Sequence, residues 1–590
     1  MSKKLFINSL LFLVILGVIT HNFWYPAPSA VAQNQSLKIV YPPDNHQTSA
    51  PRLFFIGSTT AGTKVLINGQ EINTSKQGFF APSFPLQIGQ NNFTIRTNNQ
   101  SITKIITRIA NTPKAEELET LSPNLIYPNV DLARLPNELV CFHTSAPATA
   151  TVKVELSQKT LNLTPTRDIV TLPPNSGILT ANNEPNIINA QNWAKFQGCT
   201  TVTNNENPVM TMSYEGKTIV QNQVGKITTL NPSQLPVIAV SVPEGVARTG
   251  ASTNHSRLTP LPQGTKAQVT GKEGEWLRLD YGGWIRANET QTLPTTVPPL
   301  ATIRSVGYRG NNRGMEMIFP LTNPVPITIK QEDDRFILSL HNTIAQTDTI
   351  RLDDNPLIRR LDWQQVTPTR IDYTFHFKDS QQWGYDVRYE GNQLILSLNY
   401  PPRLTSNSLQ GATILLDAGH GGTESGAVGP NGYTEKEVNL VVSKLIAEKL
   451  QGKGAKVILT RDKDEGRALG ERVAMIRDTK PTLALSIHYN ALPDNGDAEK
   501  TQGIGMFWYH PQAHDLAVFL HNYLTENLDR PSYGVFWNNL ALTRPHSAPS
   551  VLLELGFMIN PDEFEWIINP NEQEKLAQAI ADAVSLWLQK

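Results

Sequence analysis

Two hydrophobic patterns divide the chain near residue 409. Before that point, segments such as 315–319 and 335–340 alternate apolar and polar positions. Alternation with a period of two is typical of half-buried β-strands. After that point, continuous apolar runs at 413–417, 456–460, 483–487 and 551–553 alternate with stretches whose apolar residues recur at helical spacing. The chain is therefore predicted to be multidomain, with N-terminal all-β modules followed by a C-terminal α/β domain over residues 409–590.

The β-rich part is expected to hold four modules. Strand-like segments separated by turns make residues 36–114 resemble an immunoglobulin-like β-sandwich, and residues 115–230 are predicted to form a β-rich domain of unknown type. The run Gly274-Glu-Trp-Leu-Arg-Leu279, followed by Gly283-Trp-Ile285, makes residues 235–290 resemble a bacterial SH3-like barrel. The strand order of residues 300–400 resembles an AMIN domain, a module that targets some amidases to the wall or septum. Proline-rich or polar linkers at 295–299 and 401–408 separate the last modules.

The N-terminus is predicted to be an export signal of residues 1–32. Lys3 and Lys4 precede a mostly apolar run from 5 to 19, and Ala30-Val-Ala32 fits a small-residue cleavage site. An uncleaved membrane anchor is the alternative, because the stretch from 5 to 25 is long enough to span a bilayer. Polar residues inside the run favour cleavage. We therefore expect an exported protein of the periplasm or cell wall, with no stable membrane insertion.

Composition narrows the class of function. The formal net charge is −1, and charged residues make up only 17% of the chain. This balance argues against a nucleic-acid partner, because nucleic-acid binders concentrate positive charge on one face. Cys141 and Cys199 are the only cysteines, and in an exported chain they are expected to pair within one β domain. Two buried free thiols are a nearly equal alternative.

Polar residues follow three of the C-terminal apolar runs. His420 comes shortly after the first run, His488 directly after the third and Glu554 directly after the fourth. Because ligands bind at the carboxyl ends of strands in open α/β sheets, these side chains are expected to converge. Two histidines and a carboxylate are the ligand set of a catalytic zinc, which keeps a fourth position for water.

A second carboxylate belongs to a predicted helix start. Thr434 and Glu437 have the spacing of a capping box, so Glu435 is expected in the first helical turn with its carboxylate pointing past the helix end. A purely structural role is the alternative, because acidic residues favour helix N-termini through the helix dipole alone.

Five segments together resemble one enzyme family. They are Leu416-Asp-Ala-Gly-His-Gly-Gly422, Glu435-Lys-x-x-Asn-Leu440, Thr460-Arg-Asp462, Ser486-Ile-His-x-Asn490 and Leu553-Glu-Leu-Gly-Phe-x-x-Asn560. Over residues 409–590 this set closely resembles the zinc-dependent N-acetylmuramoyl-L-alanine amidases. The resemblance implies His420, Glu435 and His488 as ligands of a Zn²⁺ ion, Glu554 as the catalytic glutamate, and a six-stranded domain flanked by helices. Residues 421–426 depart from the usual Gly-Gly-x-Asp-Pro-Gly of the family, which puts only the shape of that loop in doubt.

The resemblance also implies the reaction. It predicts hydrolysis of the amide bond between N-acetylmuramic acid and L-alanine in peptidoglycan, for cell-wall remodelling or cell separation. The alternatives are a zinc peptidase that cuts within the stem peptide and a non-catalytic wall-binding scaffold. Peptidoglycan is the expected partner, and a protein activator or septal partner stays open.

One segment bears on regulation. Some relatives carry a long helical insertion after the Ser-x-His-x-Asn strand that covers the zinc. Here residues 491–502 are short and rich in Asp, Asn, Gly and Pro, which predicts a loop. No internal blocking helix is therefore expected.

Overall fold

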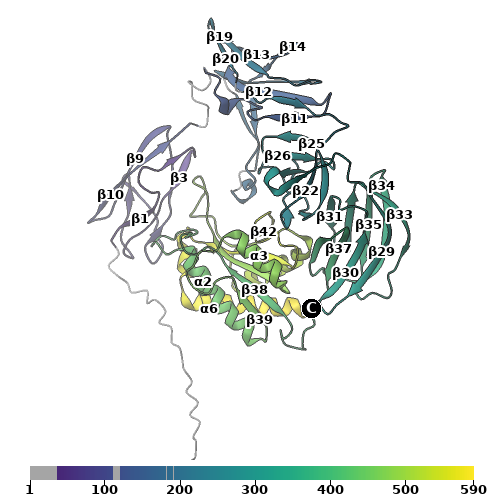
Figure 1. Cartoon of the computed structure of the whole chain (residues 1–590). Coiled ribbons are helices and arrows are strands. Elements are labelled where there is room, and N and C mark those ends of the chain that lie inside the picture. Colours follow the sequence, from purple (N-terminus) through teal and green to yellow (C-terminus); the bar gives the residue numbers. More distant parts are fainter. Residues whose placement is uncertain (1–35, 111–119, 181–182, 190–191, 223) are drawn as a thin grey trace, which may run out of the picture.

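The computed structural model describes residues 36–110, 120–180, 183–189, 192–222 and 224–590 (Figure 1). Within these residues, strands supply nearly all regular structure before residue 400, and α-helices begin at Glu435. The prediction of a largely β-rich chain is confirmed. The predicted signal at 1–32 lies outside the described residues. In the part of the chain that is described, no helix has both the length and the apolar character needed to cross a membrane.

Residues 37–109 form three small sheets around one apolar core. The sheet orders are β1-β4-β7, β2-β10-β9-β5-β6 and β3-β8, and Phe55, Phe80 and Ile95 are fully buried between them. The strands are β1 Lys38–Tyr41, β2 Gln47–Thr48, β3 Arg52–Phe54, β4 Ile56–Ser58, β5 Leu66–Ile67, β6 Gln70–Glu71, β7 Phe79–Phe80, β8 Ser83–Pro85, β9 Gly89–Arg96 and β10 Ser101–Arg108.

The second unit contains the disulfide. β12 (Leu139–Pro147) and β18 (Trp193–Thr201) pair antiparallel, and Cys141 and Cys199 stand directly opposite each other and are bonded. The expected pairing of the two cysteines is confirmed. The other elements are η1 Pro123–Leu125, β13 Thr151–Leu156, β14 Lys159–Asn162, β15 Thr164–Thr166, β16 Asp168–Thr171, η2 Gly177–Thr180, β17 Asn186–Asn189, β19 Val209–Tyr214 and β20 Lys217–Gln221.

A seven-stranded sheet links this unit to the next one. Its order is β21-β11-β25-β22-β28, with β26 beside β25 and β27 beside β26. β11 (Leu132–Arg134) and β21 (Ile227–Thr229) lie in the segment 115–230, so the sheet crosses the border that the sequence suggested near residue 230. The remaining elements are β22 Val237–Val240, β23 Glu244–Gly245, β24 Leu261–Pro262, β25 Lys266–Glu273, β26 Trp276–Leu279, β27 Trp284–Arg286, η3 Ala287–Glu289 and β28 Thr290–Leu293.

The fourth unit consists of two sheets that share one core. Their orders are β33-β29-β30-β37-β36 and β31-β32-β35-β34. Aromatic side chains on the inward positions, including Phe319, Phe336 and Phe375, are fully buried. The strands are β29 Ala301–Gly310, β30 Gly314–Pro320, β31 Ile327–Gln331, β32 Arg335–His341, β33 Thr343–Ile350, β34 Ile358–Thr367, β35 Arg370–Phe377, β36 Tyr385–Glu390 and β37 Gln393–Asn399.

The last unit is a six-stranded sheet flanked by helices. Its order is β39-β38-β40-β43-β41-β42, in which β41 runs antiparallel to β43 and every other neighbouring pair is parallel. The elements are β38 Thr413–Ala418, α2 Glu435–Gly452, β39 Lys456–Leu459, α3 Leu469–Thr479, β40 Leu483–Asn490, β41 Ile504–Trp508, η4 Pro511–Ala513, α4 His514–Asn527, β42 Ser532–Trp537, β43 Ser550–Phe557, α5 Pro561–Ile567 and α6 Pro570–Leu588.

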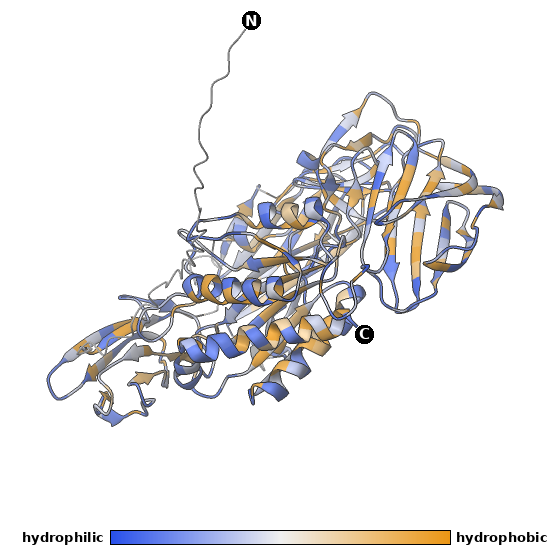
Figure 2. Cartoon of the chain, turned by 90° about the horizontal axis from the view of Figure 1, so that it is seen from below, coloured by the Kyte–Doolittle hydropathy of each residue, from blue (hydrophilic) through white to orange (hydrophobic). Residues whose placement is uncertain are grey.

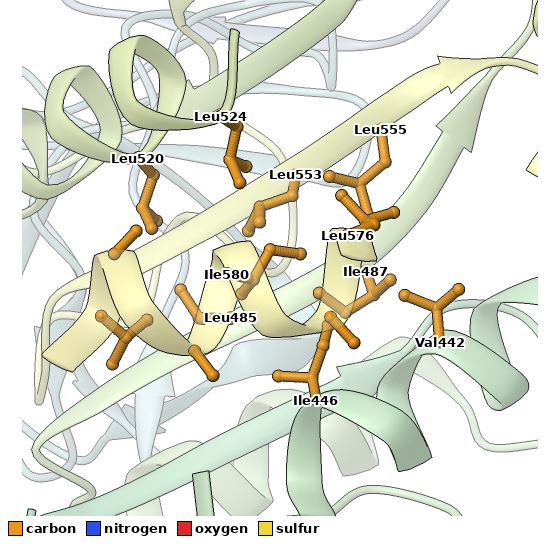
Figure 3. Close-up of a cluster of buried hydrophobic side chains, with 14 of the residues drawn as sticks. Val442, Ile446, Leu485, Ile487, Leu520, Leu524, Leu553, Leu555, Leu576 and Ile580 are labelled. Atoms are coloured by element: carbon orange, nitrogen blue, oxygen red, sulfur yellow. The ribbon is translucent and has the colours of Figure 1, made fainter. Parts of the chain in front are cut away.

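The two faces of this sheet differ. Apolar and polar residues alternate around the helices (Figure 2). α2, α4 and α6 cover one face and bury Ile446, Leu524 and Ile580 against β40 and β43 (Figure 3). Since successive strand residues point to opposite faces, His488 and Glu554 point away from this core, toward the face on which α3 packs.

The first unit also packs on the last one. The ring of Phe79 lies 5.0 Å from that of Phe564, measured between centroids, and Phe79 belongs to the same buried core as the α2 and α6 side chains. A smaller apolar cluster joins Phe54 and Ile56 of the first unit to Phe557 and Ile559 of the last. Burial of this aromatic surface holds the two units together although they are far apart in sequence.

Candidate metal centre

The three predicted ligands lie together. The ligand atoms of His420, Glu435 and His488 are all within 4.8 Å of one another. Oε2 of Glu435 is 3.2 Å from Nε2 of His420, and its Oε1 is 2.9 Å from Nδ1 of His488. Burial acts to raise the pKa of Glu435, but the two imidazoles more than offset this and hold its pKa below the ordinary value. The cluster therefore carries a carboxylate and two nitrogen donors in one place.

The turn after β38 places His420 next to Glu435 and His488. His420 has a φ of +59°, in the left-handed region that few non-glycine residues adopt. Gly419 precedes it, and a Cβ at that position would lie only 2.3 Å from the ring of His488. The glycine is therefore required for the close approach of the two histidine-bearing segments.

The start of α2 positions Glu435. Thr434 and Glu437 form the predicted capping box, and Glu435 is the first residue of the helix. Glu435 is buried, and its carboxylate accepts hydrogen bonds from the backbone NH groups of Ala427 and Tyr489. The side chain of Asn439, one turn later, donates a further bond to Oε1. These donors fix the carboxylate toward the histidines.

One carboxylate oxygen of Glu554 lies buried beside this cluster. Glu554 stands opposite His488 in the register of β40 and β43, and its Oε2 is buried with no hydrogen-bond partner among the described residues. Burial, together with the negative charge of Glu435, raises the pKa of Glu554 well above its ordinary value. The sequence placed Glu554 just beyond a strand ending at residue 553. β43 instead runs from Ser550 to Phe557, because pairing with β40 continues past the glutamate as far as Phe557.

A second buried carboxylate, Asp417, accepts hydrogen bonds on both of its oxygens. Its Oδ1 accepts hydrogen bonds from Arg472 at 2.6 Å and from the hydroxyl of Thr460 at 2.7 Å. Its Oδ2 accepts one from the hydroxyl of Ser486 at 2.6 Å. Arg472 and Asp417 are both nearly inaccessible to solvent. Asp417 is therefore a structural carboxylate that ties β38 to β39, β40 and α3.

Two buried arginines hold the backbone of the His420 turn. Arg461 donates to the carbonyl oxygens of Ala418 and Gly419 at 2.9 Å each. Arg472 donates to the carbonyl oxygen of His420 at 2.7 Å. Sequence patterns singled out Arg461 only as part of a motif, and they missed Arg472. A charged residue in an amphipathic helix carries no signal that it turns inward, so only the fold reveals this support.

Comparison with known proteins identifies the family of the C-terminal α/β domain. The family model described as N-acetylmuramoyl-L-alanine amidase matches residues 414–585. The uncharacterized protein YqiI of Bacillus subtilis is 32% identical over 187 residues, which are 32% of this chain and 90% of YqiI. The chain belongs to the N-acetylmuramoyl-L-alanine amidase family. The prediction that it is an enzyme of this class is confirmed.

Two further known proteins match about a third of this chain or slightly less. The probable cell wall amidase LytH of Staphylococcus epidermidis is 32% identical over 195 residues, and the chain spans 64% of the length of LytH. A solved structure, the N-acetylmuramoyl-L-alanine amidase AmiC2 of Nostoc punctiforme, is 30% identical, with 30% of this chain and 98% of that chain covered and a TM-score of 0.29. The match to the family model lies wholly in the C-terminal α/β domain.

Tyr533 connects the neighbourhood of Glu554 to the second unit. A Cβ at Gly505 would lie 3.1 Å from the ring of Tyr533 and 3.7 Å from Cβ of Glu554, so the tyrosine borders the site. The hydroxyl of Tyr533 donates a hydrogen bond to the carbonyl oxygen of Leu179, in η2 of the second unit. A turn from a distant β unit thus touches the rim of the site.

The segment after β40 is a loop, as predicted. Residues 491–503 contain no helix, and Leu492 and Ala498 pack into the apolar cluster shared with the first unit. Asp494 accepts a hydrogen bond from the hydroxyl of Tyr41 and lies 3.0 Å from Nε2 of His46. This loop therefore fastens the first unit to the amidase domain and contains no covering helix.

The donor set fits a zinc ion. Two imidazole nitrogens and one carboxylate, gathered from three elements, are the three protein ligands that a catalytic zinc requires. The unpartnered buried oxygen of Glu554 lies beside them, where a positive charge would offset its desolvation. The roles of these four residues stay predictions.

Proposed function

We propose that this amidase hydrolyses the bond between N-acetylmuramic acid and L-alanine in peptidoglycan with the help of zinc. The observation that carries the proposal is the cluster of His420, Glu435 and His488 beside the buried Oε2 of Glu554, which no described residue pairs with. The family match supports the choice of amide bond. His420, Glu435 and His488 would hold the ion, and Glu554 would carry the proton.

The chemistry divides between the ion and the chain. When bound, a zinc ion brings the pKa of a water to about 7 and polarises the carbonyl of the scissile amide. Glu554 then accepts the proton of the attacking water and returns it to the leaving amine nitrogen, a role that contributes about 10²–10⁴-fold to the rate. The burial of Glu554 keeps its oxygen free of competing hydrogen bonds.

The environment of Glu435 suits a ligand better than a base. Its two oxygens already accept hydrogen bonds from backbone NH groups, which stabilise the charged form. Glu554 has no such donors on Oε2 and is the more basic of the two carboxylates. Glu435 therefore coordinates and Glu554 transfers protons.

The upstream units would bind or position the wall polymer. Residues of the first, second and fourth units contact the amidase domain. The likeness of residues 235–290 to an SH3-like domain and of residues 300–400 to an AMIN domain supports a targeting role. We propose that the protein acts at the cell wall in remodelling or cell separation. A protein activator or septal partner is compatible with these units.

The experiment is a digest of purified peptidoglycan by the exported chain. We expect free peptides with N-terminal alanine and glycan strands with free lactyl carboxyl groups. A chelator should stop release and added Zn²⁺ should restore it. Fragments cut inside the stem peptide would instead identify a zinc peptidase, and absence of zinc binding would identify a scaffold.

A ligand variant sharpens this test. His488→Ala should lose both bound zinc and product release. His514→Ala is the matched control, because His514 is an exposed histidine at the start of α4, outside the cluster. Equal loss of zinc in both variants would contradict the assignment of His488.

A further inference from the structure

A cavity of about 750 Å³ lies where three units meet, away from the metal cluster. Arg257 and Thr259 of the third unit, Gln331 of the fourth, and Tyr509, Trp537 and Arg544 of the amidase domain are among its lining residues. β22, β31 and β42 mark these three units in Figure 1. None of the four proposed site residues lines it. Its volume falls in the range of sites for small organic ligands.

The walls of the cavity are held by contacts between the units. The ring of Tyr385 stacks on that of His546, with 4.6 Å between centroids. The side chain of Asn399 donates to the carbonyl oxygen of Ser547, and that of Gln512 donates to the carbonyl oxygen of His546. A cavity fixed in this way is largely formed before a ligand arrives, which reduces the entropic cost of binding.

Positive charge in the cavity is left uncompensated. Glu244 is the only carboxylate among its lining residues, whereas Arg257, Lys330, Arg477 and Arg544 all line it. Lys330 and Arg477 have acidic neighbours, Glu332 and Asp478. Arg257 and Arg544 form no ion pair within the described residues.

Arg544 is the better placed of the two unpaired arginines. Among the described residues, its guanidinium donates only to Asn539, through the carbonyl oxygen at 3.0 Å and the side-chain oxygen at 3.4 Å. Burial, reinforced by the positive charge of Arg257, lowers the pKa of Arg544 to about 10. Two like charges kept close and partly desolvated, without an acid between them, favour an anionic ligand. Arginine binds a carboxylate through two parallel hydrogen bonds.

An aromatic surface stands next to these charges. The rings of Tyr509 and Trp537 lie 5.2 Å apart between centroids, and the indole NH of Trp537 donates to the carbonyl oxygen of Tyr509. Trp537 is 61% exposed, which is unusual for so large an apolar side chain. Its fixed, accessible face suits the apolar side of a sugar ring or a small side chain.

We propose that this cavity is a second, non-catalytic binding site for a carboxylate-bearing fragment of peptidoglycan. Arg257 and Arg544 bind the carboxylate, and the Tyr509–Trp537 pair contacts the attached sugar or peptide. The inference rests on the proposed function, because that function makes peptidoglycan the ligand at hand. Two parts of the polymer carry this chemistry: the lactyl carboxyl of a muramic acid freed from its peptide, and the carboxylates of the stem peptide.

The test is binding to the full exported chain by calorimetry with two separate probes. One probe is the peptide-free disaccharide of N-acetylglucosamine and N-acetylmuramic acid, and the other is the free stem peptide. Arg544→Gln should weaken one probe about tenfold, because a charged hydrogen-bonding partner is lost. Arg304→Gln, an exposed arginine on β29 outside the cavity, is the control for the same change in charge. The probe affected identifies the part of the polymer that binds.

Activity separates this site from the metal cluster. Arg544→Gln should cleave a small soluble muropeptide at the wild-type rate but digest intact peptidoglycan more slowly. Arg257→Gln should behave alike, and thermal unfolding should show both variants folded. Unchanged binding of both probes in both variants overturns the cavity proposal, as does equal weakening in Arg304→Gln. Failure to cleave the small muropeptide in the wild type overturns the proposed function while leaving the binding result to stand.

Discussion

Two carboxylates of the amidase sheet, on strands that flank β40, have opposite surroundings. Asp417 on β38 accepts hydrogen bonds from an arginine and two hydroxyl groups, whereas no donor within the described part of the chain reaches Oε2 of Glu554 on β43. Both are buried on the face that carries α3. A carboxylate whose partners are complete stabilises the fold, and one left without partners costs stability. We therefore propose that Asp417 stabilises the strands around the site and that Glu554 acts in the reaction.

The first prediction concerns Glu554. Glu554→Gln should lower turnover by about 10²–10⁴-fold, because glutamine cannot accept the proton of the attacking water. Zinc content should stay at the wild-type level, since the three proposed ligands are untouched. The metal-free variant should be about as stable as the metal-free wild type, because glutamine is nearly isosteric with the glutamate that it replaces. Turnover and bound metal measured on the same sample check this.

Either of two results would contradict the role proposed for Glu554. Release of zinc by Glu554→Gln would make Glu554 a ligand, and Glu435 would then be wrongly assigned. Turnover near the wild-type rate would mean that another base acts. Glu499→Gln is the control for the same chemical change, because Glu499 is an exposed glutamate in the 491–503 loop outside the metal cluster.

The second prediction concerns Asp417. Asp417→Asn should lower the free energy of unfolding by about 3–5 kcal/mol, because it leaves Arg472 charged and buried without its anion. Activity should fall with it, since Arg472 also holds the carbonyl of His420. Urea unfolding measures the loss. Asp353→Asn is the control, because its pair with Arg351 is exposed and is expected to contribute at most about 1 kcal/mol. Equal losses in the two variants would contradict the structural role of Asp417.

The sequence predicted the residues of the metal cluster and Glu554 better than it predicted the partners of Asp417. His420, His488 and Glu554 could be found because each follows an apolar run, and the fold of such runs into neighbouring strands brings their polar neighbours together. The capping box likewise located Glu435. The partners of Asp417 could not be found, because nothing local distinguishes the buried Arg472 from a solvent-exposed helix charge.

Local sequence patterns also could not predict which distant segments pack against the amidase domain. The break near residue 409 follows the change in hydrophobic period, yet Phe79, far upstream, is buried in the same core. β11 and β21 join a sheet built mainly from later residues. Such contacts depend on which surfaces meet after the units fold, and periodicity within a segment carries no information about them.

The third prediction is a pH dependence of stability. Burial acts to raise the pKa of Asp417, but the charge of Arg472 and the hydroxyl hydrogen bonds outweigh it, so the pKa lies below its ordinary value. The stabilisation is then complete above the ordinary pKa of about 3.9 and is lost as the pH falls through the lower folded value. The gap in unfolding free energy between the wild type and Asp417→Asn should hold from neutral pH to about 4 and narrow below it. A gap that narrows between pH 7 and 5 would contradict this.

The smallest expected effect isolates a single partner of Asp417. Ser486→Ala removes the hydroxyl that donates to Oδ2 at 2.6 Å, but the bonds from Arg472 and Thr460 to Oδ1 remain. The free energy of unfolding should fall by about 1–3 kcal/mol, the cost of leaving a buried acceptor unpaired. Ser443→Ala is the matched control, because Ser443 is also fully buried on α2 but its hydroxyl has no partner within the described residues. That variant should be neutral or slightly stabilising, since it removes an unpaired polar group. Chemical unfolding of both variants decides the matter: if they lose the same stability, hydroxyl loss itself is the cause, and the hydrogen bond to Asp417 contributes nothing of its own.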